Sequence, residues 1–285
     1  MNILQRMRVA NYEYIEKIGQ GSFGTVFKGR NVNTGEPVVI KTEPANVKYS
    51  SLKHESNILN LLYSKSCRNI PPTYWYGIAE NQYRVFVMPY YEETVETAVM
   101  EYSGLRNTLF RNIMRSAILI LKSVHDKYVV HRDIKPANWM IRRNELVLID
   151  FGLATFYVDS EARHISPAET PRRYIVGSPK YASWNIHRGE EYSRRDDLLS
   201  VLYIGLFCIE REYLWNNVPE FNPEVERIEN SDIGHPRNRW FQSQKQIDEI
   251  LSKTERWPAL AHFARNVYSL SFHERPSYDA YAELF

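Results

Sequence analysis

One stretch of eight residues concentrates side chains that can do acid–base and metal chemistry. It reads His-Arg-Asp-Ile-Lys-Pro-Ala-Asn from His131 to Asn138, and it places Asp133 five positions before the asparagine. An aspartate can accept a proton or bind a cation through oxygen, and an asparagine offers a further oxygen ligand. This stretch is therefore the strongest candidate for a reactive site in the sequence.

A second aspartate follows the first at a distance of 17 residues. Asp150-Phe-Gly comes directly after the apolar segment Leu146–Ile149, which is typical of a short β-strand. Asp133, Asn138 and Asp150 are hard oxygen ligands or proton acceptors, the types that Mg²⁺–phosphate chemistry uses. Any one of them alone is more simply explained as a turn residue. Their occurrence together, in this order, favours a site for a magnesium-bound phosphate.

A glycine-rich segment stands between two predicted strands near the start of the chain. Gly19, Gly21 and Gly24 are the types that a backbone needs to approach phosphates closely, although an ordinary tight hairpin also fits them. A dinucleotide-binding loop would lead into a helix and then to an acidic residue about 20 positions on. Here a strand follows instead, and Lys41 comes 17 residues after Gly24. The pattern favours a flap over a nucleotide, with a lysine that reaches its phosphates.

Two charges stand in apolar surroundings. Lys41 ends the apolar strand predicted over Pro37–Thr42, so its ammonium must find an anion or reach water. Glu55 is the single charge on the apolar face of the helix predicted over Ser51–Leu62. The alternatives are an ion pair between the two residues and two unrelated surface charges.

The hydrophobic pattern divides the chain into a strand-rich first part and a helical remainder. Apolar residues recur at helical spacing over residues 109–124, and a buried helix is predicted from Asp197 onward. A ligand is expected in the crevice between two such parts. The remaining predicted strands are Tyr12–Ile18, Thr25–Arg30, Thr73–Gly77 and Arg84–Met88.

Composition excludes several classes of protein. Of the 285 residues, 44% are hydrophobic and 25% are charged, and these ordinary globular values argue against extended disorder. The formal net charge is only +2, which argues against nucleic acid or an anionic membrane as the main partner. Cys67 and Cys208 are expected to be free thiols. The apolar run Leu198–Ile209 is too short to cross a bilayer, and the N-terminus lacks the apolar region of a secretory signal. We therefore expect an intracellular protein, cytoplasmic or nuclear.

Taken together, these motifs resemble those of the eukaryotic protein kinases, and the resemblance covers nearly the whole chain. It implies the bilobal protein-kinase fold of the α+β class, with a small β-rich N-lobe and a larger, mainly helical C-lobe. The catalytic domain would span residues 12–285 after a short N-terminal extension over residues 1–11. Within it, the N-lobe would cover about 12–88, the hinge about 89–94 and the C-lobe about 95–285.

The resemblance also implies roles for single residues. Lys41 would hold the α- and β-phosphates of ATP while it is paired with Glu55, and Asp133 would orient and deprotonate the substrate hydroxyl. Lys135 is of the type found in serine/threonine kinases, where it touches the γ-phosphate. Asn138 and Asp150 would hold Mg²⁺. The residues implied in nucleotide binding are Gly19, Gly21, Ser22, Gly24, Val26 and Lys41, with Met88 as gatekeeper and the backbone of Pro89 and Tyr91 facing adenine.

A narrower resemblance is to the casein kinase 1 group. The usual Ala-Pro-Glu is absent, and the segments 177–187, 191–198 and 275–279 are similar to signatures of that group. Asp197 would then bind the backbone of the catalytic loop, although a plain N-cap of the buried helix is the alternative. Leu202 and Trp184 replace residues usual in the group, which indicates a divergent member.

The expected partners are protein substrates with serine or threonine hydroxyls, and the chain is expected to act as a monomer. Three cationic residues cluster in or near the activation segment: Arg172, Arg173 and Lys180. We hypothesise that their charges favour substrates with acidic or phosphorylated residues upstream of the target hydroxyl. The alternative is solvated loop charge.

A rival function of another class is a pseudokinase, a scaffold that binds nucleotide or partners without transferring phosphate. Such chains usually lose the strand lysine, the catalytic aspartate or the metal aspartate. This chain keeps Lys41, Asp133 and Asp150, which favours the enzyme.

Overall fold

The computed structural model describes most of the chain. Ser22, Arg172, Arg173 and residues 212–243 lie outside the described residues, and so do the predictions that concern them. The described residues are 8–21, 24–79, 82–101, 106–143, 145–167, 169–170, 175–211 and 244–285.

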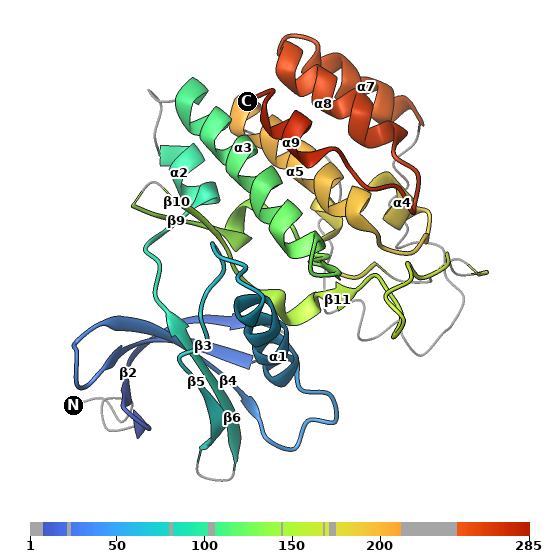
Figure 1. The fold of residues 1–285 in the computed structure, drawn as a ribbon. Helices are drawn as coiled ribbons and strands as arrows, with labels where there is room; N and C mark the ends of the chain where they lie inside the picture. Colours follow the sequence, from blue (N-terminus) through green and yellow to red (C-terminus); the bar gives the residue numbers. More distant parts are fainter. Residues whose placement is uncertain are drawn as a thin grey trace.

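The first lobe is built on one antiparallel sheet, whose strands lie in the order β1-β2-β3-β4-β6-β5 (Figure 1). Its inner strands are rich in Val, Ile and Phe, which suit a pleated and buried surface. The predicted strands are all present, with shifted ends. The bounds are β1 Arg8–Val9, β2 Tyr12–Gly21, β3 Gly24–Asn31, β4 Pro37–Pro44, β5 Trp75–Ala79 and β6 Tyr83–Pro89.

One helix packs against this sheet. Helix α1 covers Ser51–Ser64, and Ser50 caps it by accepting a hydrogen bond from the backbone N–H of Lys53 at 2.9 Å. Its buried face includes Leu52, Leu59 and Glu55, so the one charge predicted on an apolar face is indeed buried. In Figure 1 this helix lies beside the sheet, on the side that faces the second lobe.

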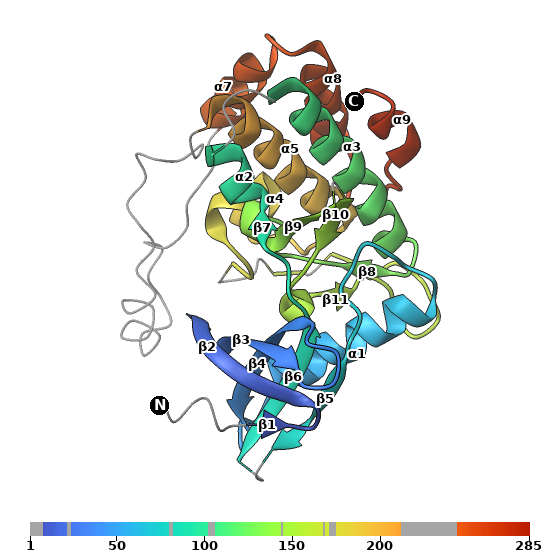
Figure 2. The ribbon, with the colours of Figure 1, turned by 90° about the vertical axis from the view of Figure 1, so that its left-hand side faces the viewer.

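The second lobe is mainly helical and joins the first through residues 90–92, between β6 and β7 (Figure 2). A short three-stranded antiparallel sheet, β10-β9-β7, and a two-stranded one, β11-β8, lie where the lobes meet. The helices are α2 Val95–Glu101, α3 Arg106–His125, α4 Trp184–His187, α5 Arg194–Glu210, α7 Gln244–Thr254, α8 Pro258–Ser269 and α9 Tyr278–Ala282. The strands are β7 Glu93–Thr94, β8 Val129–Val130, β9 Trp139–Arg142, β10 Glu145–Leu148 and β11 Thr155–Phe156.

Helix α5 forms the centre of the helical lobe. Its residues from Asp196 to Cys208 are all buried, and α3 and α8 pack against it. The helix begins three residues earlier than predicted, because Ser193 is the N-cap and its backbone N–H donates to the Asp196 carboxylate at 2.8 Å. No helix in the described part of the chain is both long and apolar enough to span a membrane.

The cysteine prediction is confirmed. Cys67 and Cys208 are both buried and both free. Cys208 lies within α5, where burial raises the pKa of its thiol to about 12. The thiol is therefore protonated at neutral pH and serves as a small apolar side chain.

Candidate active site

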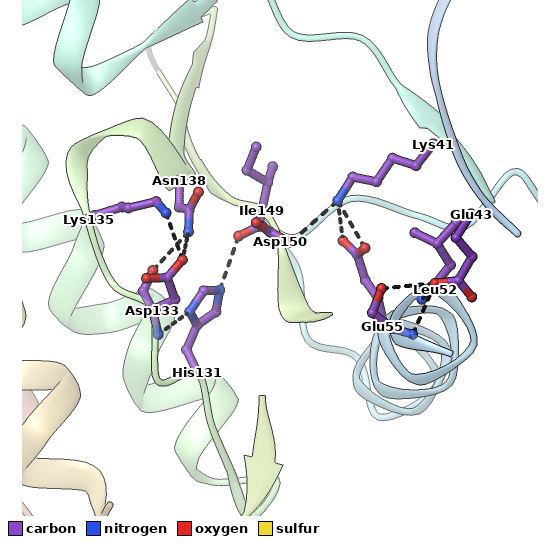
Figure 3. Close-up of polar contacts among 11 residues, drawn as sticks. Lys41, Glu43, Leu52, Glu55, His131, Asp133, Lys135, Asn138, Ile149 and Asp150 are labelled. Atoms are coloured by element: carbon purple, nitrogen blue, oxygen red, sulfur yellow. Dashed lines mark hydrogen bonds and ion pairs between the residues drawn. The ribbon is translucent and has the colours of Figure 1, made fainter. Parts of the chain in front are cut away.

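Lys41 and Glu55 meet between β4 and α1. The Lys41 ammonium lies 2.8 Å and 2.9 Å from the two carboxylate oxygens of Glu55, whose side chain is 2% exposed (Figure 3). Burial alone would lower the pKa of Lys41, but the carboxylates of Glu55 and Asp150 outweigh burial and raise it. The ammonium is therefore charged at neutral pH. Of the two alternatives left open by the sequence, the ion pair is the one that the structure contains.

Asp150 approaches the same ammonium from the other lobe. It comes two residues after the end of β10, adopts φ 68°, and places Oδ1 3.5 Å from the Lys41 ammonium. The positive charge of Lys41 lowers the pKa of the Asp150 carboxyl. The next residue, Phe151, is fully buried, and its ring packs on the imidazole of His131 with ring centroids 4.8 Å apart. This packing fixes the turn that presents Asp150 to the cleft.

Asp133 is held by donors on three sides. The Lys135 ammonium lies 2.8 Å from its Oδ2, and the backbone N–H of Ser178 donates to its Oδ1 at 2.8 Å. The Asn138 amide donates to the backbone oxygen of Asp133 at 2.8 Å and to its Oδ2 at 3.1 Å. The side chains predicted from the octapeptide therefore converge on one carboxylate (Figure 3).

His131 connects the loop of Asp133 to the end of β10. Its Nδ1 accepts from the backbone N–H of Asp133 at 3.3 Å, and its Nε2 donates to the backbone oxygen of Ile149 at 3.1 Å. The same imidazole thus connects the backbone of Ile149, just before Asp150, to the backbone of Asp133 (Figure 3). Because the ring is fully buried, it fixes the relative positions of the two aspartates.

Asp197, on α5, binds the backbone of the loop that carries Asp133. Its carboxylate accepts from the backbone N–H of His131 at 2.7 Å and of Arg132 at 3.0 Å, and His125 Nε2 donates to it at 2.9 Å. Burial would raise the pKa of Asp197, but these hydrogen bonds outweigh burial and lower it. The alternative that Asp197 is the N-cap of its helix is wrong, because Ser193 has that position.

The segment that follows crosses close to the loop at Gly177. This residue has φ +88°, and a Cβ placed on it would lie 2.2 Å from the backbone oxygen of Arg132. Only glycine allows the two backbones to approach this closely. The approach is what brings the Ser178 N–H to Asp133.

The described residues that are implied in nucleotide binding lie on β2, β3, β4 and β6 of the first lobe and in the segment that follows β6. Gly19 and Gly21 end β2, and Gly24 starts β3 with φ +151°, where a Cβ would lie 1.9 Å from the backbone oxygen of Thr42. Val26 packs against the main core, to which Met88 belongs.

The segment that joins the lobes carries the other two implied residues. Pro89 ends β6 opposite Val38. The side chain of Tyr91 packs with Met140 and Val147. The contact of its backbone with adenine, which the resemblance implies, stays a prediction.

The donor set suits Mg²⁺. The side-chain amide of Asn138 donates its hydrogens to Asp133, so its carbonyl oxygen is left to bind a cation. The side chain of Asp150 is 45% exposed and presents its carboxylate beside Lys41. No cluster of three or more His, Cys, Asp or Glu that could hold a metal by itself occurs among the described residues. Few protein oxygens, with substrate phosphates as the other ligands, are typical of magnesium sites for nucleotides.

Sequence reasoning missed several residues that hold this site. Glu43, on β4 beside Lys41, binds the start of α1. His125 and Tyr278 hydrogen-bond to each other below Asp197. Glu43 had a detectable signal, because it lies two residues after Lys41 and so on the same face of a strand. Tyr278 lies in the segment 275–279 that resembles the casein kinase 1 group, but nothing in the sequence marks its bond to His125, 153 positions earlier in the chain.

The comparisons with known proteins agree with this geometry. A family profile described as the protein kinase domain matches residues 12–283. The structure of vaccinia related kinase 3 superposes with a TM-score of 0.68 at 18% sequence identity, covering 96% of this chain and 85% of that one. At this identity the likeness shows a shared fold, the bilobal fold that the motifs imply. Since the profile spans almost the whole sequence, this chain belongs to the protein kinase family.

Proposed function

We propose that the protein is a serine/threonine protein kinase that transfers the γ-phosphate of Mg-ATP to serine or threonine hydroxyls of protein substrates. One observation carries the proposal. The Lys41 ammonium of one lobe lies 3.5 Å from the Asp150 carboxylate of the other, so the two lobes present a phosphate-binding cation and a metal-binding anion to one space. Phosphoryl transfer depends mainly on such positioning and on charge stabilisation.

Asp133 accepts the proton of the attacking hydroxyl in this proposal. Its carboxylate is only 6% exposed and is oriented by Lys135, Asn138 and the N–H of Ser178. A carboxylate with fixed direction holds the hydroxyl in line with the phosphorus. It need not be a strong base, because the proton leaves late in a loose transition state.

The remaining polar residues manage the phosphates. Lys41, kept charged and fixed by Glu55, binds phosphate oxygens of ATP, and Asn138 and Asp150 hold Mg²⁺. The bound Mg²⁺ supplies positive charge that offsets the charge on the phosphates. On the other side, Lys135 lies between Asp133 and the Ser178 hydroxyl, 3.0 Å from the latter, where it can contact the transferred group.

Serine/threonine specificity and the casein kinase 1 type rest on particular residues. Lys135, two positions after Asp133, is the type that serine/threonine kinases carry, and it is tied to the segment at Ser178. The segments 177–187 and 191–198 are similar to those of the casein kinase 1 group. Lys180 is exposed on the 3₁₀ turn Pro179–Tyr181, next to Ser178, and places a positive charge where a protein substrate is expected to bind. We therefore propose a preference for acidic or phosphorylated residues upstream of the target.

Phosphate incorporation tests the proposed function directly. The purified protein is expected to transfer ³²P from labelled Mg-ATP to casein, and Asp133→Asn and Asp150→Asn are each expected to abolish transfer while their unfolding curves remain cooperative. If the wild-type protein binds Mg-ATP but incorporates no phosphate into casein or peptide arrays, the protein is a pseudokinase instead. On the arrays, equal labelling with and without upstream acidic or phosphorylated residues would contradict the proposed preference alone.

A further inference from the structure

A buried carboxylate on β4, in addition to that of Glu55 on α1, takes no part in the reaction proposed above. Glu43 is 3% exposed and lies two residues after Lys41. A buried carboxylate is costly unless it is paired or hydrogen-bonded. Its partners are therefore informative about what it does.

Those partners lie at the start of α1. One carboxylate oxygen of Glu43 accepts from the backbone N–H of Ser51 at 3.2 Å, from the Ser51 hydroxyl at 3.1 Å and from the backbone N–H of Leu52 at 3.4 Å. The other oxygen accepts from the Ser50 hydroxyl and lies 4.0 Å from the Arg84 guanidinium. Glu43 thus binds the N–H groups that the first turn of a helix leaves without a partner inside the helix.

The charge of Glu43 also fits this end of the helix. The N-terminus of a helix carries a partial positive charge, which an acidic residue in the first turn usually offsets. Helix α1 has no acidic residue in its own first turn. Glu43 supplies that negative charge from the neighbouring strand, so the interaction joins two elements instead of stabilising one.

The two links between β4 and α1 match in spacing. Lys41 and Glu43 are two residues apart on the strand, and their partners Glu55 and Ser51 are four residues apart on the helix. Two strand residues advance ~6.6 Å and four helical residues advance ~6 Å. Both links can therefore form without strain, and each one restricts the helix to the position in which the other forms (Figure 3).

We propose that Glu43 is a positioning residue for phosphoryl transfer: it holds the first turn of α1 against β4 and thereby keeps Glu55 on Lys41. This inference rests on the proposed function, in which that ion pair fixes the phosphate-binding lysine. Without the carboxylate, the first turn of α1 loses its attachment to the strand. His54, one residue before Glu55, still donates from Nε2 to the backbone oxygen of Ala154 at 2.7 Å. The helix therefore stays bound to the second lobe, while its first turn is no longer held against β4.

Steady-state kinetics of Glu43→Ala and Glu43→Gln test the proposal. Loss of a helix cap of ordinary strength shifts an equilibrium by a factor of about 5 to 30, and kcat of Glu43→Ala is expected to fall by that factor. Glu43→Gln retains one acceptor oxygen without the charge, so a smaller loss is expected. It also preserves the test if the alanine variant folds poorly. An unchanged kcat in both variants overturns the proposal.

A double-mutant cycle separates positioning from general stability. If Glu43 acts through Glu55, the Glu43→Ala substitution costs no more than about twofold in kcat when it is made in a Glu55→Gln background. An equal fold-loss in both backgrounds would mean that Glu43 serves the fold alone, and the proposal would be wrong. Asp279→Ala is the matched control, because it removes an exposed carboxylate from the first turn of α9, where it pairs with Lys122 at 2.6 Å. That control is expected to leave kcat unchanged.

Hydrogen–deuterium exchange keeps this test distinct from the test of the proposed function. Exchange in residues 51–64 is expected to rise in Glu43→Ala and to stay at the wild-type level in Asp279→Ala. If the wild-type protein transfers no phosphate, the proposed function fails. The attachment of α1 by Glu43 is then judged by exchange alone, and unchanged exchange in Glu43→Ala overturns it.

Discussion

His125 and Asp197 form a fully buried contact that connects the helical core to the loop of Asp133. Nε2 of the imidazole lies 2.9 Å from the carboxylate, and each side chain is 1% exposed. The same carboxylate accepts from the backbone of His131 and Arg132, and Arg132 has the positive φ of 69°. The contact therefore holds the strained backbone of Arg132 in place. Such strain persists only when the surrounding structure holds it in this way.

The lowered pKa of Asp197 predicts how stability depends on pH. A carboxyl whose pKa is lower in the folded protein contributes stability above its unfolded pKa of about 3.9 and loses that contribution as the pH falls through the folded value. Urea unfolding of the wild type and of Asp197→Asn between about pH 6 and pH 3 measures this contribution. The difference in unfolding free energy between the two proteins is expected to narrow as the pH falls. A difference that stays constant over this range would contradict the prediction.

Removal of the Tyr278 hydroxyl is expected to weaken the support of His125. The hydroxyl lies 2.6 Å from His125 Nδ1, and both groups are buried. Leaving a buried polar atom without its partner costs about 1–3 kcal/mol. Tyr278→Phe is expected to lose that amount in denaturant unfolding. Tyr83→Phe, at a tyrosine that is 44% exposed, is expected to change stability little, and equal losses in the two variants would argue against the hydrogen bond as the cause.

The Lys41–Glu55 pair predicts a rescue. Lys41→Met leaves the Glu55 carboxylate buried without its cation, and the expected loss in unfolding free energy is about 3–5 kcal/mol. Adding Glu55→Gln removes the unpaired charge, so the double variant is expected to recover most of that stability. Neither variant is expected to transfer phosphate, because both lack the phosphate-binding ammonium. A double variant less stable than Lys41→Met would show that the two residues do not interact as a pair.

Gly177→Ala is expected to displace the segment that orients Asp133. The new Cβ would lie 2.2 Å from the backbone oxygen of Arg132, at φ +88°. Strain of this kind costs about 1–3 kcal/mol, and relief by backbone movement pulls the Ser178 N–H away from Asp133. We expect a fall in kcat that exceeds the change in the KM for ATP. Gly35→Ala is the control, since Gly35 also has a positive φ, of +77°, but has nothing within 4 Å of its Cβ position. A similar loss of kcat in both would exclude the close approach as the cause.

The ends of the elements show where sequence reasoning stopped. Strand β4 was predicted to end at Thr42 but continues to Pro44. That extension puts Glu43 on the sheet beside Lys41, and pairing with Arg84 on β6 is what extends the strand. The segment Thr73–Gly77 was likewise predicted two residues early, and β5 begins at Trp75, where pairing with β6 starts. Strand ends depend on the partner strand, which local periodicity does not contain.

The sequence by itself determined which residues are candidates for the chemistry and in what order they occur along the chain. Lys41, Glu55, Asp133, Asn138 and Asp150 could be selected because a charge in an apolar segment, or an acid in a specific motif, is visible in local pattern. The family and the two-part fold follow from the same signals.

Only the tertiary structure decided how those residues are held. The family resemblance implied that Asp197 binds the backbone of the catalytic loop, and the structure contains that contact. His125, Tyr278 and Glu43 act through hydrogen bonds to groups on other elements, some of them backbone atoms whose availability depends on how the chain is packed. Because a backbone N–H looks the same at every position of a sequence, the partner of such a side chain cannot be identified from local pattern, even where the side chain itself stands out, as Glu43 does. They exist only once the lobes, α1 and α5 have packed together.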